Sequence, residues 1–72
     1  MAGIVLNIND YEGEVGGESV HELTRGLDVR FDEVSESGDR VEFTGPREDL
    51  IALVTRFTDD PETHAALVAL IR

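Results

Sequence analysis

Cysteine and lysine are absent from this chain of 72 residues, and each absence excludes a class of site. Without cysteine there is no disulfide framework, no thiolate zinc site and no iron–sulfur cluster. Without lysine there is no Walker A phosphate loop and no Schiff-base catalysis. No apolar run approaches the ~20 residues that span a bilayer, and no stretch has the pattern of a signal peptide. We therefore expect a cytoplasmic protein (host cytoplasm if viral) that needs no cofactor.

Acidic residues dominate the chain, with 16 Asp and Glu against 6 Arg and a net charge of −10. Phosphate groups would repel such a chain, so we expect no direct binding to nucleic acid. The charge is concentrated between Asp10 and Glu36, where nine carboxylates face only two arginines. An asymmetric field of this kind steers basic partners and accelerates their encounter.

The length allows one small domain over residues 1–72, and apolar patterning predicts three strands near residues 3–9, 27–34 and 40–44. The first run, Ile4 to Ile8, is too apolar for clean alternation, which favours a central strand covered on both faces. The other two runs alternate apolar with polar residues. A short turn with Gly38 at positive φ joins them, which predicts an antiparallel β-hairpin over about 27–44.

Helices are predicted near residues 20–25, 47–57 and 62–71. Ser19 fits an N-cap for the first and Gly26 its stop, although a strand over 22–25 competes with this interpretation. Pro46 fits the first position of the second helix. Asp60 fits the N-cap of the third, with Pro61 next. The third helix is apolar nearly all round, so we expect it to be wedged in the core or covered by another chain.

Together these elements predict an α+β fold, with a small three-stranded mixed or antiparallel sheet and two C-terminal helices packed on one face. Residues on the alternating strands and on the apolar stripe of the second helix should form the core. They are Val29, Phe31, Val41, Phe43, Leu50, Leu53, Val54 and Phe57.

Motifs that would carry chemistry are incomplete. The run from His21 to Arg25 begins like a metalloprotease helix, but Arg25 stands where the second histidine is required. Asp10, Glu12 and Glu14 alternate like the start of a calcium loop, yet Val15 stands where the glycine belongs. We therefore expect no metal site.

Catalytic groups are equally isolated in the sequence. His21 and His64 could each act as a general base, but a lone histidine near a helix start is common at protein surfaces. Paired carboxylates such as Asp59 and Asp60 would need a desolvating cleft, for which a domain this small has little volume. We therefore expect a protein that is not an enzyme.

The favoured hypothesis is a small acidic interaction protein that modulates a partner with a basic surface. Its carboxylates would imitate DNA phosphates and engage a nucleic-acid-binding protein, as a regulator or a viral inhibitor does. Two alternatives stay open: an accessory homo-oligomer whose acidity is adaptation to salt, and a ligand-binding or enzymatic domain completed at a dimer interface. The expected partner-binding residues are Asp10, Glu12, Glu14, Glu18, Asp28, Asp32 and Glu36.

The apolar third helix also predicts self-association. One small sheet can cover only part of a helix that is apolar on all sides, so a second copy of the chain should cover the remainder. We expect a homodimer whose interface includes Leu67, Leu70 and Ile71.

Overall fold

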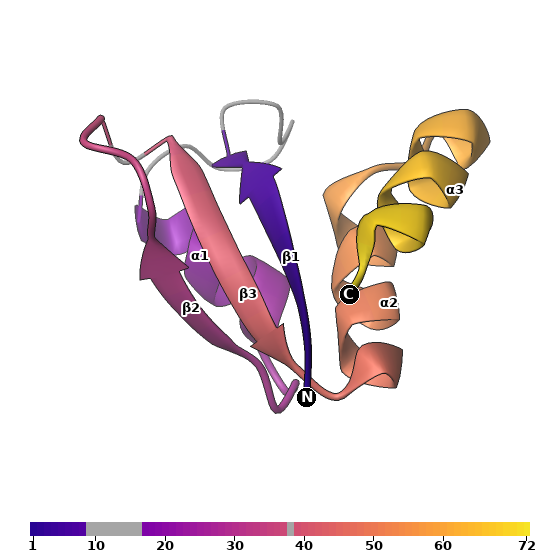
Figure 1. Ribbon diagram of the computed structural model, residues 1–72, viewed down its shortest axis with the longest axis horizontal. Helices are drawn as coiled ribbons and strands as arrows, with labels where there is room; N and C mark the ends of the chain where they lie inside the picture. The colour runs from indigo at the N-terminus through magenta and orange to yellow at the C-terminus, as the bar shows by residue number, and fades with distance from the viewer. Residues whose placement is uncertain (9–16, 38) are drawn as a thin grey trace.

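A computed structural model describes residues 1–8, 17–37 and 39–72, with side chains described from Val20 onward in the second range. The predicted α+β fold and its element order are confirmed (Figure 1). The elements are β1 (Ala2–Asn7), α1 (Gly17–Thr24), β2 (Arg30–Glu33), β3 (Arg40–Gly45), α2 (Arg47–Phe57) and α3 (Pro61–Leu70).

The three strands form an antiparallel sheet in the order β1-β3-β2. The two strands of the predicted hairpin, β2 and β3, are neighbours, and Phe31 pairs with Phe43. On the other side of β3, Ile4 of β1 pairs with the same Phe43. The predicted glycine of the hairpin turn, Gly38, lies outside the described residues.

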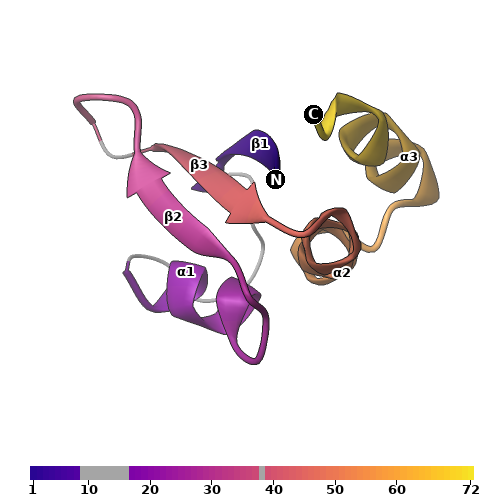
Figure 2. The same cartoon turned by 60° about the horizontal axis from the view of Figure 1, so that its bottom comes forward.

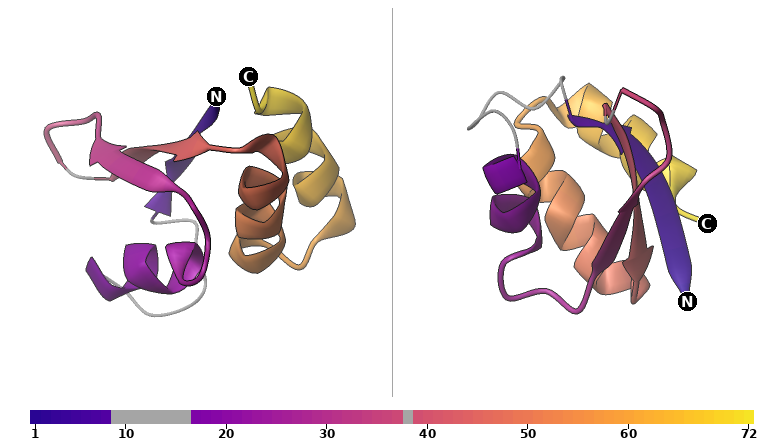
Figure 3. Two further views of the ribbon diagram at one scale, coloured as in Figure 1. Left: turned by 90° about the horizontal axis from the view of Figure 1, so that it is seen from below. Right: turned by 90° about the vertical axis from the view of Figure 1, so that its left-hand side faces the viewer.

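All three helices leave one face of the sheet open. Figure 3 shows α1 and α2 on the same side of the sheet, with α3 beside α2 and beyond the β1 edge. Figure 2 shows the same arrangement with α1 next to β2. We call the opposite face, which carries Val5, Asp32 and Glu42, the outer face. The core lies between the sheet, α1 and α2, and its buried apolar residues are Ile4, Leu6, Val20, Leu23, Val41, Phe43, Leu50, Leu53, Val54, Phe57 and Ile71.

The prediction that β1 is a central strand covered on both faces is wrong. It is an edge strand with alternating burial: Ile4 and Leu6 are buried, whereas Val5 points to the outer face and is 46 % exposed. Valine contributes to strand formation through its β-branched side chain even where it is not buried. An apolar residue in a strand therefore did not require a second covering layer.

The second predicted strand is shorter than expected, because the backbone amides of Leu27 and Asp28 donate to groups on α1 and α2. Gly26 ends α1 with a φ of 77°, and the Leu27 amide donates to the Thr24 carbonyl at 3.0 Å. The Asp28 amide donates to the Asp49 carboxylate at 3.0 Å. Side-chain and cap hydrogen bonds thus replace the strand ladder before Arg30.

Two predicted core residues lie elsewhere than expected. Phe31 is 41 % exposed because β2 is an edge strand, where only α1 and β3 can cover its ring. Its contacts are an edge-on His21 ring at 5.8 Å and the tilted ring of Phe43 at 6.5 Å. Val29 is half-buried. The remaining six predicted core residues are buried.

The first helix begins three residues earlier than predicted, and Pro46 lies just before the second helix instead of at its first position. α1 begins at Gly17, so Ser19 lies within its first turn, and the competing strand over 22–25 is wrong. Pro46 precedes α2, with an extended backbone, and its carbonyl accepts from the amides of Asp49 and Leu50. Asp60 caps α3 and Pro61 is its first residue, as predicted.

Helix α3 is not wedged in the core, since none of its residues is buried. The chain after it turns back to the sheet, where Arg72 and Gly3 exchange two backbone hydrogen bonds at 2.9 and 3.0 Å. This pairing covers one position of the β1 edge and brings Ile71 into the core at 7 % exposure.

Candidate functional site

The predicted acidic surface is only partly described. Asp10, Glu12 and Glu14 lie outside the described residues, and so does the side chain of Glu18. The other three predicted carboxylates, Asp28, Asp32 and Glu36, are all exposed. Their positions decide which of them can act together.

Asp28 and Glu36 lie at opposite ends of β2. Asp28 is beside the start of α2, where its amide is bound by Asp49. Glu36 lies in the turn that follows β2, at the other end of the strand. The structure therefore does not bring these two carboxylates together on one patch.

Asp32 lies between them in a mixed environment. It pairs directly with Glu42 across the β2–β3 ladder, and the two carboxylates share the outer face. Arg30 and Arg40 lie on the same face, each two residues along a strand from one of these acids. Diagonal neighbours of opposite charge offset the Asp32–Glu42 repulsion. The outer face of the sheet is thus charged but close to neutral.

The strongest grouping of described carboxylates is at the end of the sheet that carries the β2–β3 turn. We call this end the hairpin end. Here the Ile8 amide donates to the Asp39 carbonyl at 2.8 Å. The turn itself is held by the Arg40 amide, which donates to the Ser35 hydroxyl oxygen at 3.1 Å, and by the Val34 amide, which donates to the Arg40 carbonyl. Glu33 and Glu36 are exposed at this end, and Asp39 is half-buried.

This arrangement adds Glu33 and Asp39 to the predicted set. Ile8 is the last described residue before the acidic residues 10–14 of the sequence, and its amide is bound to the acidic turn. Pattern reasoning missed these two residues because the pairing of β1 with β3, which brings Ile8 to Asp39, spans thirty-one positions. The sequence feature that could have indicated Glu33 and Asp39 was the polar turn between two strands of alternating apolar and polar residues.

The histidines and paired carboxylates have structural contacts. His64 Nε2 lies 3.0 Å from the Thr55 hydroxyl, which links α3 to α2, and His21 packs on Phe31. Asp60 accepts from both the amide and the hydroxyl of Thr63, at 2.9 and 2.6 Å. These hydrogen bonds hold the pKa of Asp60 below its ordinary value of 3.8, because they stabilise the carboxylate. This carboxylate therefore serves as a helix cap.

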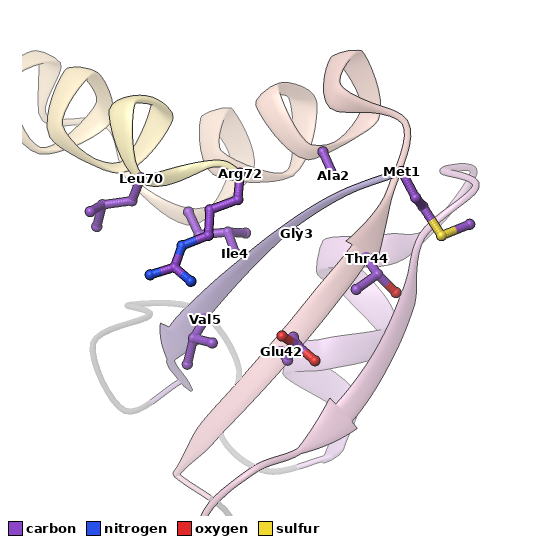
Figure 4. A pocket seen from close by; sticks show the side chains of 9 residues that line it. All are labelled: Met1, Ala2, Gly3, Ile4, Val5, Glu42, Thr44, Leu70 and Arg72. Atoms are coloured by element: carbon purple, nitrogen blue, oxygen red, sulfur yellow. The ribbon is translucent and has the colours of Figure 1, made fainter.

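The predicted self-association residues of the C-terminal segment divide into three environments. Ile71 is in the core of its own chain, Leu67 is half-buried, and Leu70 is 59 % exposed. Leu70 borders an open hollow of about 490 Å³ beside the β1 edge (Figure 4). Met1 and Val5, two further exposed apolar residues, line the same hollow, and Glu42 and Arg72 stand at its rim. Leu70 is thus the residue of the three that presents apolar surface.

Among residues 1–8, 17–37 and 39–72, no three His, Asp or Glu side chains are grouped so as to hold a metal ion. Within the same ranges, no helix has the length and apolar character of a membrane span. Comparison with family models, with curated proteins and with solved structures gives no significant match.

Proposed function

We propose that this chain is a non-enzymatic interaction protein that binds an Arg- and Lys-rich surface of another protein through the hairpin end. The binding surface would combine Glu33, Glu36 and Asp39 with the carboxylates of residues 10–18. Proteins that normally bind nucleic acid present basic surfaces of this kind, and they are the partner class that the charge pattern favours. The proposal places the site at one end of the sheet and leaves Asp28 outside it.

The observation that carries the proposal is the hydrogen bond from the Ile8 amide to the Asp39 carbonyl. It places Ile8, which precedes the acidic residues 10–14 in the sequence, next to an acidic turn. Carboxylates that converge from two chain segments produce a stronger local potential than the same charges spread over the surface. A field concentrated at one end of a small protein orients it as it approaches a basic partner.

The exposure of these carboxylates determines how they would act. Glu33 and Glu36 are solvent-exposed, so each would contribute modestly to affinity. Charges at the rim of an interface act mainly on the association rate. Removal of one carboxylate should therefore weaken binding slightly, whereas reversal of several should abolish it.

The test compares two triple variants that carry the same net charge. The first is Glu12→Lys with Glu14→Lys and Glu18→Lys. The control is Glu48→Lys with Asp59→Lys and Glu62→Lys, three exposed positions on or next to α2 and α3. Binding of a synthetic arginine-rich peptide is measured by titration calorimetry at low salt, and circular dichroism verifies the fold of each variant.

The proposal expects the first variant to lose at least about ten-fold more affinity than the control, because only the first alters residues assigned by the proposal to the binding surface. Equal losses in the two variants would show that the peptide responds to net charge alone. In that case the acidity is general solubilising charge, as in adaptation to high salt, and the proposed site does not exist.

A further inference from the structure

Among the residues that the structure describes, the peptide groups on the outer edge of β2 have no strand partner. The Val34 amide donates to the Arg40 carbonyl, so Val34, Asp32 and Arg30 direct their peptide groups toward β3. Because peptide groups alternate in direction along a strand, those of Phe31 and Glu33 are directed away from the sheet. β2 is the outermost strand of the order β1-β3-β2, and no described strand lies on its outer side (Figure 1). An edge of this kind can pair with another strand.

The β1 edge differs from the β2 edge. On β1, Arg72 already occupies the outward peptide groups of Gly3 through two hydrogen bonds. On β2 all four residues are exposed, and they include Phe31, whose ring is 41 % exposed on the face where α1 packs. An exposed phenylalanine at an open strand edge is apolar surface that a partner strand would cover.

We propose that β2 is the pairing edge of a two-fold symmetric homodimer in which β2 strands of two copies lie antiparallel, with Phe31 opposite Phe31 of the second copy. This register joins two sheets into one of six strands. It places Arg30 of each copy opposite Asp32 of the other, on the outer face. The two Phe31 rings meet on the helix side and extend the row of rings from His21 and Phe43. The inference rests on other observations than the proposed acidic function, although both surfaces include Glu33.

Charge selects this register from its neighbours. Two edge strands can pair only where the outward-directed peptide groups of both strands face one another. These groups belong to every second residue, so the sum of two paired residue numbers changes by two from one allowed register to the next. The register one step to one side puts Arg30 opposite Arg30 of the second copy, and the step to the other side puts Asp32 opposite Asp32. Like charges directly opposite destabilise a strand pair, whereas opposite charges stabilise it. The Phe31-centred register alone makes two opposite-charge pairs within β2.

The experiment exchanges these charges. Sedimentation equilibrium is measured from micromolar to millimolar concentration at moderate salt for wild type, Arg30→Asp, Asp32→Arg and the double variant. Each single variant creates two like-charge pairs across the axis and should raise the dimer dissociation constant about ten- to thirty-fold. The double variant restores both pairs and should return it to near the wild-type value.

Mixing gives the most specific result. Arg30→Asp presents two acids and Asp32→Arg presents two arginines, so an equimolar mixture of these single variants should form a heterodimer more tightly than either variant pairs with itself. Leu70→Glu is the matched control for the apolar C-terminal helix, and it should leave the dissociation constant unchanged. Amide exchange supplies a readout that needs no variant: protection of the Phe31 and Glu33 amides should increase with protein concentration.

Three results would overturn the proposal. The first is a wild-type protein that remains monomeric at millimolar concentration. The second is a dimer that Leu70→Glu disrupts while the charge variants leave it intact, which would place the interface on α3. The third is a mixture of single variants that associates no better than its components.

Discussion

The guanidinium of Arg56 on α2 caps the C-terminus of α1, with its Nη1 atom 2.6 Å from the Arg25 carbonyl oxygen. The same nitrogen lies 3.2 Å from the Leu23 carbonyl and 3.4 Å from that of Glu22. The last carbonyls of a helix have no partner within the helix and carry partial negative charge. One arginine therefore joins the two helices through contacts between residues that are 31 to 34 positions apart in sequence.

Replacement of Arg56 should test this contact. Arg56→Met keeps much of the side-chain stem but leaves the α1 carbonyls without their donor, and should lower the free energy of unfolding by about 1–2 kcal/mol. Arg56→Lys retains the charge with a single ammonium group and should lose less. Urea denaturation followed by circular dichroism measures both. Equal stability of wild type and Arg56→Met would mean that water replaces the guanidinium without cost.

Leucine truncation should distinguish the buried stripe of α2 from the exposed end of α3. Leu53 is fully buried, so Leu53→Ala should cost about 2–5 kcal/mol through lost burial and the cavity that remains. Leu70 is 59 % exposed, so Leu70→Ala should change stability by about 0.5 kcal/mol or less. Chemical denaturation of the two variants gives the comparison. A cost near zero for Leu53→Ala would place that face of α2 in solvent.

Local sequence patterns predicted the helices and strands of this fold better than they predicted which of these elements lie next to one another. The alternation of apolar residues around Val41 and Phe43 identified β3 correctly, and the spacing of Leu50, Leu53 and Val54 identified the buried face of α2. These patterns depend on neighbours within a few positions, which the sequence states directly. Whether a strand lies at the centre or the edge of a sheet depends on distant segments. That is why the coverage of β1 and the burial of Phe31 were mistaken.

The candidate site shows the same division. The concentration of carboxylates between Asp10 and Glu36 is visible in the sequence, but their arrangement depends on the sheet. The antiparallel ladder sets Arg40 among the acids of the outer face and separates Asp28 from Glu36 by the length of β2. It also brings Asp39 beside Ile8, which no local pattern indicates.

A close backbone approach at the end of β3 makes Gly45 sensitive to substitution. A Cβ atom at this position would lie 2.5 Å from the Asp28 carbonyl oxygen and 3.3 Å from the Val29 Cα. Gly45→Ala should therefore force the 27–29 segment away from the sheet and cost about 1–3 kcal/mol. Gly3→Ala is the matched control on the neighbouring strand, because its nearest atom is the Thr44 methyl at 3.4 Å. Thermal unfolding should show a clear loss for Gly45→Ala and little change for Gly3→Ala.

The Asp60 cap predicts a defined pH dependence. Its pKa in the folded state is lowered below the usual 3.8 by the hydrogen bonds from Thr63. A lowered folded-state pKa means that the stabilising contribution is complete above the unfolded value and is lost as the pH falls through the folded value. Asparagine also caps a helix but does not titrate. The difference in free energy of unfolding between wild type and Asp60→Asn should therefore shrink as the pH falls through the folded-state pKa of Asp60. A difference that is constant with pH would show that the charge of Asp60 contributes nothing.

Salt should affect the two proposed associations in opposite directions. Binding of a basic partner at the hairpin end depends on attraction between opposite charges, so its affinity should fall as salt screens that attraction. Dimerisation through β2 brings together two chains of net charge −10, whose overall repulsion salt relieves. The two Arg30–Asp32 pairs lose some strength in salt, but they are few against this global repulsion. Calorimetry with the arginine-rich peptide and sedimentation of the free protein, each from about 20 to 500 mM salt, should give slopes of opposite sign. A dimer that weakens with salt would indicate that local charge pairs, not pairing of the β2 backbone and Phe31 contact, dominate its stability.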